Sequence, residues 1–145
     1  MRFLLALLVL AITGCGSPQS TLSSSSLTKH KHPNASTPGK LCSGSDTYFD
    51  GYRYKEQIAH CARHVTKTMK LDISKNYGID EADWGKYEFD HWYPLAIGGS
   101  TDIENIFPEP IDEATIKDKL EDQLYHQMDR GEITQEGAIR QIDEW

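Results

Sequence analysis

Apolar and polar residues follow two different spacings in the first half of the region after residue 40. Residues 47–54 ("TYFDGYRY") are aromatic and interrupted by turn residues, which favours a short strand or hairpin. From residue 61 to residue 77, large apolar side chains recur every four positions, at Val65, Met69 and Ile73. This spacing predicts a helix over 61–77, and Gly78 is placed to end it.

The second half combines a strand pattern with two helical patterns. Residues 87–108 alternate, turn at Gly98-Gly99 and resume, which predicts a hairpin closed by a loop. A helix is expected from about residue 112 to 130, where Gly131 ends it, and a last helix from 134 to 145. The expected apolar stripe of the longer helix is Ile116, Leu120, Leu124 and Met128. The order strand, strand, helix predicts an α+β fold.

The first residues are typical of an export signal and do not belong to this domain. Residues 1–14 contain Arg2, an apolar run and then small residues, and the run is too short for a comfortable transmembrane helix. Ile12-Thr13-Gly14-Cys15 resembles the lipobox, after which cleavage leaves a lipid-modified cysteine as the N-terminus. The alternative is an ordinary secretory signal with a chance cysteine. We expect Cys15 to carry the lipid that anchors the protein.

A tether and one domain are expected to follow the signal. Residues 15–40 begin with Cys15 and are rich in Ser, Thr, Pro and Gly, so they cannot form a core. The remaining residues 41–145 are enough for one domain and too few for two separate cores. Within the domain, Cys42 and Cys61 are the remaining cysteines. Export favours a disulfide between them over a structural zinc site, because no convincing partner ligands accompany them.

The charge of the domain is acidic but unevenly distributed. All 22 acidic residues and only 11 of the 15 basic residues lie after residue 40, which gives the domain a charge of −11. Within the expected 61–77 helix, Arg63, Lys67 and Lys70 share one face. This face is the best candidate for contact with nucleic-acid phosphates, and the alternative is an ordinary solvated helix surface.

The stretch "DHWYPLAIGGSTDIENIFP" combines an Asp-His pair, Pro-Leu, Gly-Gly and, fourteen residues after His91, Asn105. It resembles the core of the HNH nucleases, the ββα-metal group that includes many small phage and bacterial endonucleases. The flanking segments are similar to those of small HNH members, so the resemblance covers most of residues 42–145. It implies an α+β domain with a ββα-metal centre that hydrolyses phosphodiester bonds.

Each motif residue suits one task in that chemistry. An imidazole such as that of His91 can take a proton from water, and the Asp90 carboxylate is the kind of ligand that Mg²⁺, or another divalent cation such as Mn²⁺, prefers. In the family, the residue that matches Asn105 holds the site together across the hairpin. Neighbouring residues on a flat strand point to opposite faces, so Asp90 and His91 reach one site only if the strand twists or bends. Otherwise they are a satisfied polar pair in a hairpin.

The second metal ligand is not determined by the sequence. Family members supply it from the helix after the second strand, often as His or Asn, and no His stands in the first turns here. Asp118, thirteen residues after Asn105, has a spacing at which some members carry a ligand. Asp112 and Glu113, nearer the start of the helix, are the alternatives.

Two functions follow from these observations. The first is a lipid-anchored, Mg²⁺-dependent endonuclease that acts outside the cytoplasm, on the outer membrane facing the periplasm in a Gram-negative cell. Its expected substrate is DNA, with RNA as a second candidate. The second is a catalytically inactive HNH-fold envelope lipoprotein that binds a protein partner. The acidic domain and the missing helix His favour the second function, and the presence of Asp90, His91 and Asn105 together favours the first.

Overall fold

A computed structural model describes residues 33–145, and they form two small sheets and three α-helices. The order is β1 (Phe49–Arg53), β2 (Ile58–Cys61), α1 (Lys67–Tyr77), β3 (Tyr87–His91), β4 (Ile106–Pro110), α2 (Ile111–Asp129) and α3 (Gln135–Glu144). The fold is therefore α+β, as expected. The predicted signal peptide, Cys15 and the tether up to residue 32 lie outside the described residues. Within residues 33–145, no helix combines the length and apolarity needed to cross a membrane.

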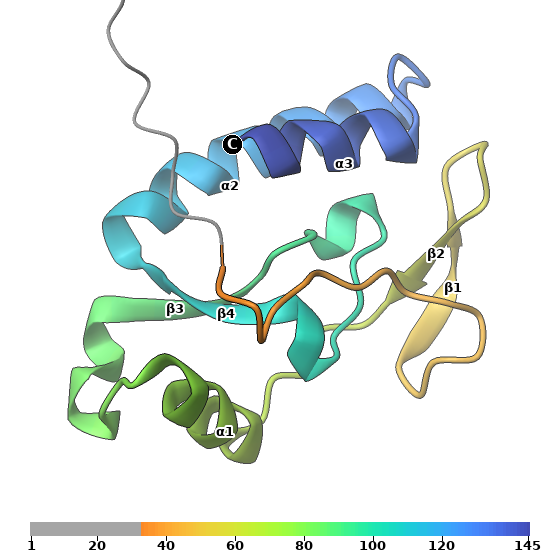
Figure 1. Cartoon of the computed structure of the whole chain (residues 1–145). Coiled ribbons are helices and arrows are strands. Elements are labelled where there is room, and N and C mark those ends of the chain that lie inside the picture. Colours follow the sequence, from red (N-terminus) through yellow and green to blue (C-terminus); the bar gives the residue numbers. More distant parts are fainter. Residues whose placement is uncertain (1–32) are drawn as a thin grey trace, which may run out of the picture.

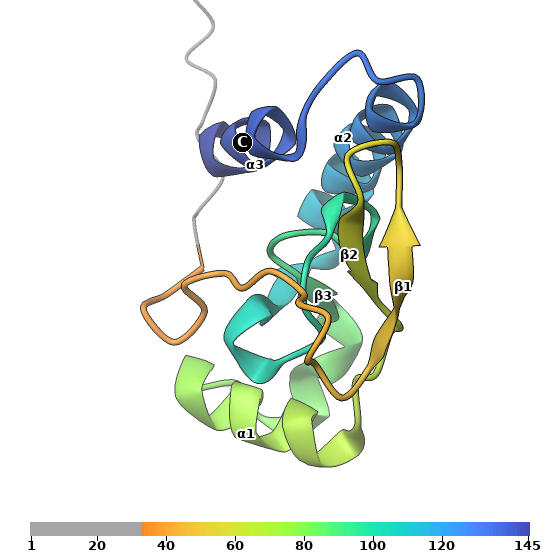
Figure 2. The same ribbon diagram turned by 90° about the vertical axis from the view of Figure 1, so that its right-hand side faces the viewer.

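The first hairpin carries the disulfide. β1 and β2 pair antiparallel with an irregularity between Phe49 and Tyr52. Cys61, the last residue of β2, is bonded to Cys42, with 5.8 Å between their Cα atoms, which confirms the predicted pairing. Figure 2 shows the tip of this hairpin beside the C-terminal end of α2, where the rings of Tyr54 and Tyr125 lie 6.3 Å apart.

The predicted 61–77 helix is correct at its end and wrong at its start. Cys61 is in a strand, and α1 begins at Lys67 because the side chain of Thr66 accepts a hydrogen bond from the Met69 amide and caps the helix. At the other end, Gly78 has a φ of 66° and closes the helix as expected. Arg63 therefore precedes the helix, and it does not share a helical face with Lys67 and Lys70.

The second hairpin and α2 form a continuous unit. β3 and β4 pair antiparallel in regular register from Tyr87–Pro110 to His91–Ile106, and α2 starts at the next residue. The connecting loop turns at Gly98, whose φ is 93°, in agreement with the predicted turn. Figure 1 shows α1 on one side of this hairpin and α2 with α3 on the other.

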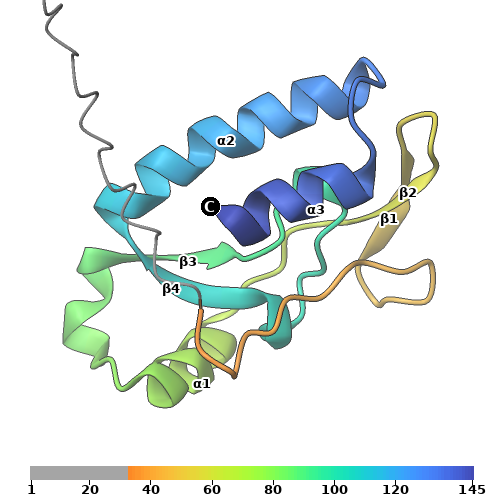
Figure 3. The ribbon, with the colours of Figure 1, turned by 45° about the horizontal axis from the view of Figure 1, so that its top comes forward.

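Two apolar cores fill these layers. Ile73 of α1 packs with Phe89 and Ile106 on one face of the hairpin. On the other face, Phe107 packs with side chains of α2 and α3, which lie side by side in Figure 3. The buried members of this second core are Ile58, Trp92, Ile97, Phe107, Leu124, Met128, Ala138 and Ile142.

The predicted apolar stripe of α2 is correct only toward the C-terminal end of the helix. Leu124 and Met128 are buried, whereas Ile116 is 49% exposed and Lys117 is fully buried. The reason is that this level of α2 faces the carboxylates of Asp90 and Glu109, which a buried cation can satisfy and an isoleucine cannot. α3 begins after its N-cap Thr134, in agreement with the predicted helix.

Residues 34–41, here called the strap, run along the domain although most of them were expected to belong to the tether. Thr37 is buried, and its hydroxyl donates to the carbonyl of Ile106. The Gly39 amide donates to the carbonyl of Glu104, and Leu41 bridges to Gly99. The strap therefore contacts the loop between β3 and β4 at several points.

Candidate functional site

Asp90 and His91 end β3 and approach each other at the free edge of the strand. Their cross-strand partners are Phe107 and Ile106, so their Cβ atoms point to opposite faces of the hairpin. β3 pairs only with β4 in its sheet, so its other edge has no strand partner. Despite the opposite faces, His91 Nδ1 lies 3.8 Å from Asp90 Oδ1. Both residues are buried, with 2% of His91 and 7% of Asp90 exposed.

The Asp90 carboxylate is held by two cations. Lys117 Nζ donates to Oδ2 at 2.7 Å, and Arg63 Nη1 lies 3.7 Å from Oδ1. Lys117 also donates to the backbone carbonyl of His91 at 2.8 Å, which fixes the end of β3. Burial alone would raise the pKa of Asp90, but the adjacent His91 and the charge of Lys117 outweigh it and hold this pKa well below its usual range. Asp90 is therefore ionised.

Lys117 also faces two glutamates, and the four side chains Asp90, Glu109, Lys117 and Glu121 form what we call the Lys117 cluster. Lys117 Nζ donates to Glu121 Oε1 at 2.5 Å and lies 4.0 Å from Glu109 Oε2. Glu109 is fully buried, and neither of its oxygens accepts a hydrogen bond from the described residues. Burial raises the pKa of Glu109 to about 8 and that of Glu121 to about 7, against the attraction of Lys117.

The Lys117 cluster was missed in the sequence, although a signal for it was present. Lys117 lies seven residues before Leu124 and four before Glu121, on the helix face that turns inward. Because lysine side chains are seldom fully buried, this position does not stand out in the sequence as a member of a buried cluster.

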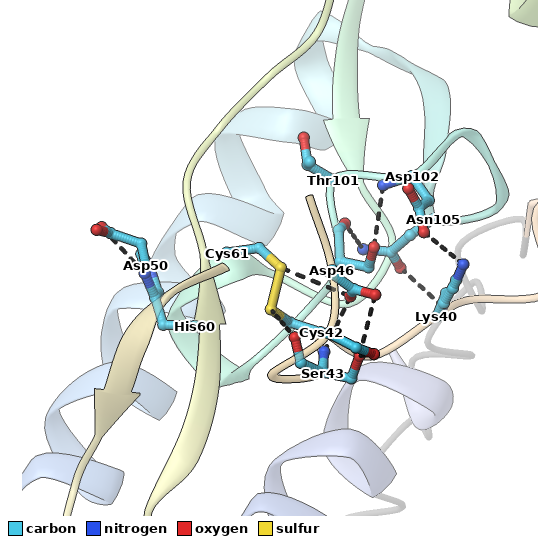
Figure 4. Close-up of a disulfide and its surroundings, with 12 residues drawn as sticks. Lys40, Cys42, Ser43, Asp46, Asp50, His60, Cys61, Thr101, Asp102 and Asn105 are labelled. Atoms are coloured by element: carbon cyan, nitrogen blue, oxygen red, sulfur yellow. Dashed lines mark hydrogen bonds and ion pairs between the residues drawn. A yellow bond between two sulfur atoms is a disulfide. The ribbon is translucent and has the colours of Figure 1, made fainter. Parts of the chain in front are cut away.

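Asn105 uses all of its hydrogen-bonding capacity to hold the loop between β3 and β4. Its Oδ1 accepts from the amides of Tyr93 and Lys40, at 2.9 and 3.2 Å. Its Nδ2 donates to the carbonyls of Tyr93 and Ser100, at 2.9 and 2.7 Å. Figure 4 shows Asn105 facing the strap at Lys40. Because every donor and acceptor is engaged, Asn105 can position the loop but has no free group for chemistry.

Gly99 packs against the same loop at a distance that only glycine tolerates. A Cβ atom at this position would lie 1.7 Å from the carbonyl oxygen of Tyr93 and 3.0 Å from Asn105 Nδ2. The Gly-Gly of the motif is thus required by a close backbone approach as well as by the turn at Gly98.

Asp118 is exposed on α2, next to Lys117, and its charge helps to raise the pKa of Glu121. Asp112 and Glu113 lie in the first turn of α2. The assignment of a second ligand among these three residues stays a prediction.

A different trio offers the tightest group of potential metal donors. In the described part of the chain, only Cys42, Asp46 and Cys61 bring three such atoms within 4.8 Å of one another. Their sulfurs are joined in the disulfide, as Figure 4 shows, and a disulfide provides no thiolate. This trio can bind a metal only after reduction.

The three predicted nucleic-acid-binding residues have different surroundings. Lys67 Nζ is paired with Glu81 at 2.7 Å. Lys70 Nζ lies 5.0 Å from the centre of the Phe89 ring, and Arg63 donates to the carbonyl of Phe89 at 3.2 Å. Arg63 and Lys70 both line a cavity of about 650 Å³ beside β3, and Lys67 does not.

Comparison with known proteins gave no match among protein-family models, curated proteins or solved structures. The function must therefore be inferred from the side chains described above.

Proposed function

We propose that this protein is a metal-dependent endonuclease of the HNH type that hydrolyses phosphodiester bonds of DNA, with RNA as a second candidate substrate. The observation that carries the proposal is the 3.8 Å approach of His91 Nδ1 to Asp90 Oδ1 at the free edge of β3. The hairpin that bears this pair runs directly into α2, and Asn105 holds its loop. This order of strand, loop, strand and helix is what the resemblance to HNH nucleases implies for a ββα-metal centre.

His91 supplies the general base. With Nδ1 toward a carboxylate, the proton is favoured on Nδ1, and Nε2 keeps a lone pair that can accept a proton from water. Nε2 has no hydrogen-bond partner within residues 33–145, so no protein group competes for that lone pair. Because Nε2 is also buried, neighbouring side chains must move before water reaches it. The Arg63 side chain, 51% exposed, lies 3.7 Å from Asp90 Oδ1 beside this pair.

The Asp90 carboxylate suits a divalent ion that keeps most of its water. Mg²⁺ usually binds through one or two protein oxygens, and Mn²⁺ accepts an imidazole as well. Lys117 occupies Oδ2, so a divalent ion would bind Oδ1, beside His91 and in place of Arg63. A divalent ion held there would supply charge neutralisation for the phosphate and the leaving oxygen. Asp118 remains the proposed second carboxylate, with Asp112 and Glu113 as alternatives.

Plasmid nicking tests the proposal. The oxidised protein is incubated with supercoiled plasmid in Mg²⁺, in Mn²⁺ and in EDTA, and the same series is run with His91→Ala. Loss of a general base reduces the rate by about 10²- to 10⁴-fold. The matched control is His126→Ala, since His126 is exposed on α2, and this variant should cut at the unchanged rate. Absence of cutting by the folded, oxidised protein in either metal would overturn the proposal.

We also propose that the protein acts outside the cytoplasm, attached to the cell envelope by lipid on Cys15. The support is the lipobox-like sequence before Cys15 and the Ser- and Pro-rich segment after it. Cell fractionation tests this proposal, with Cys15→Ala as the variant. The native protein should be recovered in the membrane fraction and the variant should not. Recovery of the mature protein in the cytoplasm would overturn it.

One observation favours a non-catalytic envelope protein that binds a protein partner. Lys117 already neutralises Asp90 from inside the fold, so the carboxylate needs no metal. The domain charge of −11 also repels nucleic acid. Calorimetric titration with Mn²⁺ separates the two functions. Binding that disappears in Asp90→Asn supports the nuclease, and the absence of binding supports the non-catalytic protein.

A further inference from the structure

A cavity of about 650 Å³ lies along β3 and extends to the start of α2. Tyr87, Glu88 and Phe89 contribute from the strand, and Ile111 contributes from the first turn of the helix. Arg63 links this cavity to the candidate site, because its guanidinium lines the cavity and also lies 3.7 Å from Asp90 Oδ1. A ligand in the cavity is therefore adjacent to the Asp90–His91 pair.

The lining combines apolar and aromatic surface with positive charge. Ile111 is 51% exposed, which leaves a large apolar side chain open at the cavity. The Phe89 ring is covered by Lys70 Nζ at 5.0 Å, a cation–π contact with a flexible side chain. Glu88 supplies an exposed carboxylate, 3.6 Å from Arg63 Nη2. Phe89 is a core residue, 4% exposed, so the aromatic surface open to a ligand is that of Tyr87. Tyr87, the exposed Ile111, two cations and one acceptor together suit a flat, polar-edged ring attached to phosphates.

We propose that this cavity holds an unpaired nucleotide of the strand that is cut, so that the preferred substrate is single-stranded or locally unpaired nucleic acid. This inference rests on the proposed nuclease function. The faces of a base are accessible to side chains only when the base is unstacked, whereas a duplex offers only base edges and backbone. A volume of about 650 Å³ lies within the range of pockets that enclose a small ligand.

The contacts assign a task to each part of the nucleotide. The base lies against Ile111 and Tyr87, and its exocyclic amino group can donate to Glu88. When the base enters, the Lys70 ammonium leaves its contact with the Phe89 ring and binds a phosphate. Arg63 contacts the phosphate nearest to Asp90 and leaves that carboxylate accessible. Few phosphates are contacted, in keeping with an acidic domain.

The contact with few phosphates sets an expected salt dependence. Each neutralised phosphate of a single strand contributes about −0.7 to the slope of log affinity against log salt. Contact through Arg63 and Lys70 therefore predicts a slope of about −1.4. In Lys70→Gln the slope should fall by about half, whereas Lys75→Gln, an exposed lysine of α1 outside the cavity, should leave it unchanged.

Binding is measured by fluorescence anisotropy with a labelled short oligonucleotide, offered as a single strand and as a duplex. The protein carries His91→Ala so that no strand is cut during the titration. We expect the single strand to bind about tenfold more tightly, because stacking of one base contributes about 5- to 150-fold. Ile111→Glu should weaken binding of the single strand by about tenfold. Ile116→Glu is the matched control, since Ile116 is equally exposed on α2 and lies outside the cavity.

The outcomes separate this inference from the proposed nuclease. Equal affinity for single strand and duplex, or equal effects of the two isoleucine variants, overturns the inference even if the plasmid is nicked. Binding that depends on Ile111 supports the single-strand site. If the plasmid is not nicked, that binding still supports the site, although the proposed nuclease activity is then overturned. An unlabelled acidic peptide serves as competitor. Displacement of the oligonucleotide by this peptide at matched charge and concentration identifies a protein ligand and overturns the inference.

Discussion

Replacing Lys117 with methionine tests whether the Lys117 cluster is held together by its buried ammonium. Lys117 is fully buried and donates to Asp90, to Glu121 and to the backbone of His91. Methionine fills a similar volume, so the change removes the charge and three hydrogen bonds with little loss of packing. The variant therefore isolates the electrostatic contribution of one side chain.

The expected loss is about 3–5 kcal/mol at pH 7, the cost of leaving one partner of a buried ion pair uncompensated. The figure is for one carboxylate because the pKa of Glu109 is raised to about 8 and that of Glu121 to about 7. At pH 7, Glu109 is then mostly protonated and Glu121 is about half protonated. The uncompensated charge is mainly that of Asp90. Asp90→Asn should cost less, because both glutamates remain to pair with Lys117.

The sign of the pH dependence follows from the same charges. Without Lys117, which lowers them, the pKa values of buried Glu109 and Glu121 rise further above that of an unfolded glutamate, so near pH 7 the folded variant binds more protons than the folded native protein. The variant therefore gains stability as the pH falls toward 5, and its deficit relative to the native protein shrinks. Urea unfolding followed by tryptophan fluorescence at pH 7 and pH 5 measures both quantities.

Lys119→Met is the control, because Lys119 lies on the exposed side of the same helix. It should leave the urea midpoint close to that of the native protein at both pH values. A Lys117→Met variant as stable as this control would refute the role of the ammonium. A large loss that does not shrink at pH 5 would show that packing, and not charge, is responsible.

Two further substitutions test the buried carboxylate and the motif glycine. Burial raises the pKa of Glu109 from 4.5 to about 8, so folding becomes less favourable as the pH rises through that interval. Glu109→Gln should therefore raise the urea midpoint relative to the native protein at pH 9 and change it little at pH 5. An equal change of the urea midpoint at the two pH values would contradict the raised pKa of Glu109. Gly99→Ala places a Cβ 1.7 Å from the carbonyl oxygen of Tyr93 and should destabilise by at least about 1–3 kcal/mol, the cost of overpacking. In calorimetry Gly85→Ala should keep the native Tm, because nothing lies within 4 Å of its added Cβ, and a Gly99→Ala variant with the same Tm would exclude the clash.

The elements that could be predicted from the sequence are those whose signals are local. The loop of the second hairpin turns at Gly98 as its Gly-Gly indicates, and α1 ends at Gly78 as expected. The start of α1 was placed too early because Val65 fits the helical spacing although it precedes the N-cap. Thr66 followed by Met69 was the better signal, since capping depends on one specific hydrogen bond.

The candidate site could be predicted only in part, because its remaining contacts join segments far apart in the chain. The adjacency of Asp90 and His91 is visible in the sequence, but their approach at the free edge of β3 is not, because neighbouring strand residues point to opposite faces. Lys117 is 27 residues from Asp90, and its spacing to Leu124 indicates an inward-facing position without identifying Asp90 as its partner. Arg63 reaches the same edge from the segment between β2 and α1, where its neighbours predicted a helix.

The strap gives the N-terminal end of the described chain a mechanical connection to the loop of the second hairpin. A pulling force at residue 34 would act first on the contacts of Thr37 and Gly39, and then on the hydrogen bond from the Lys40 amide to Asn105. The disulfide at Cys42 stops further peeling, because it transfers the load to β2 through a covalent bond. Tension would therefore loosen the support of Asn105 while the rest of the domain stays folded, and the loop beside His91 would respond to load on the attachment.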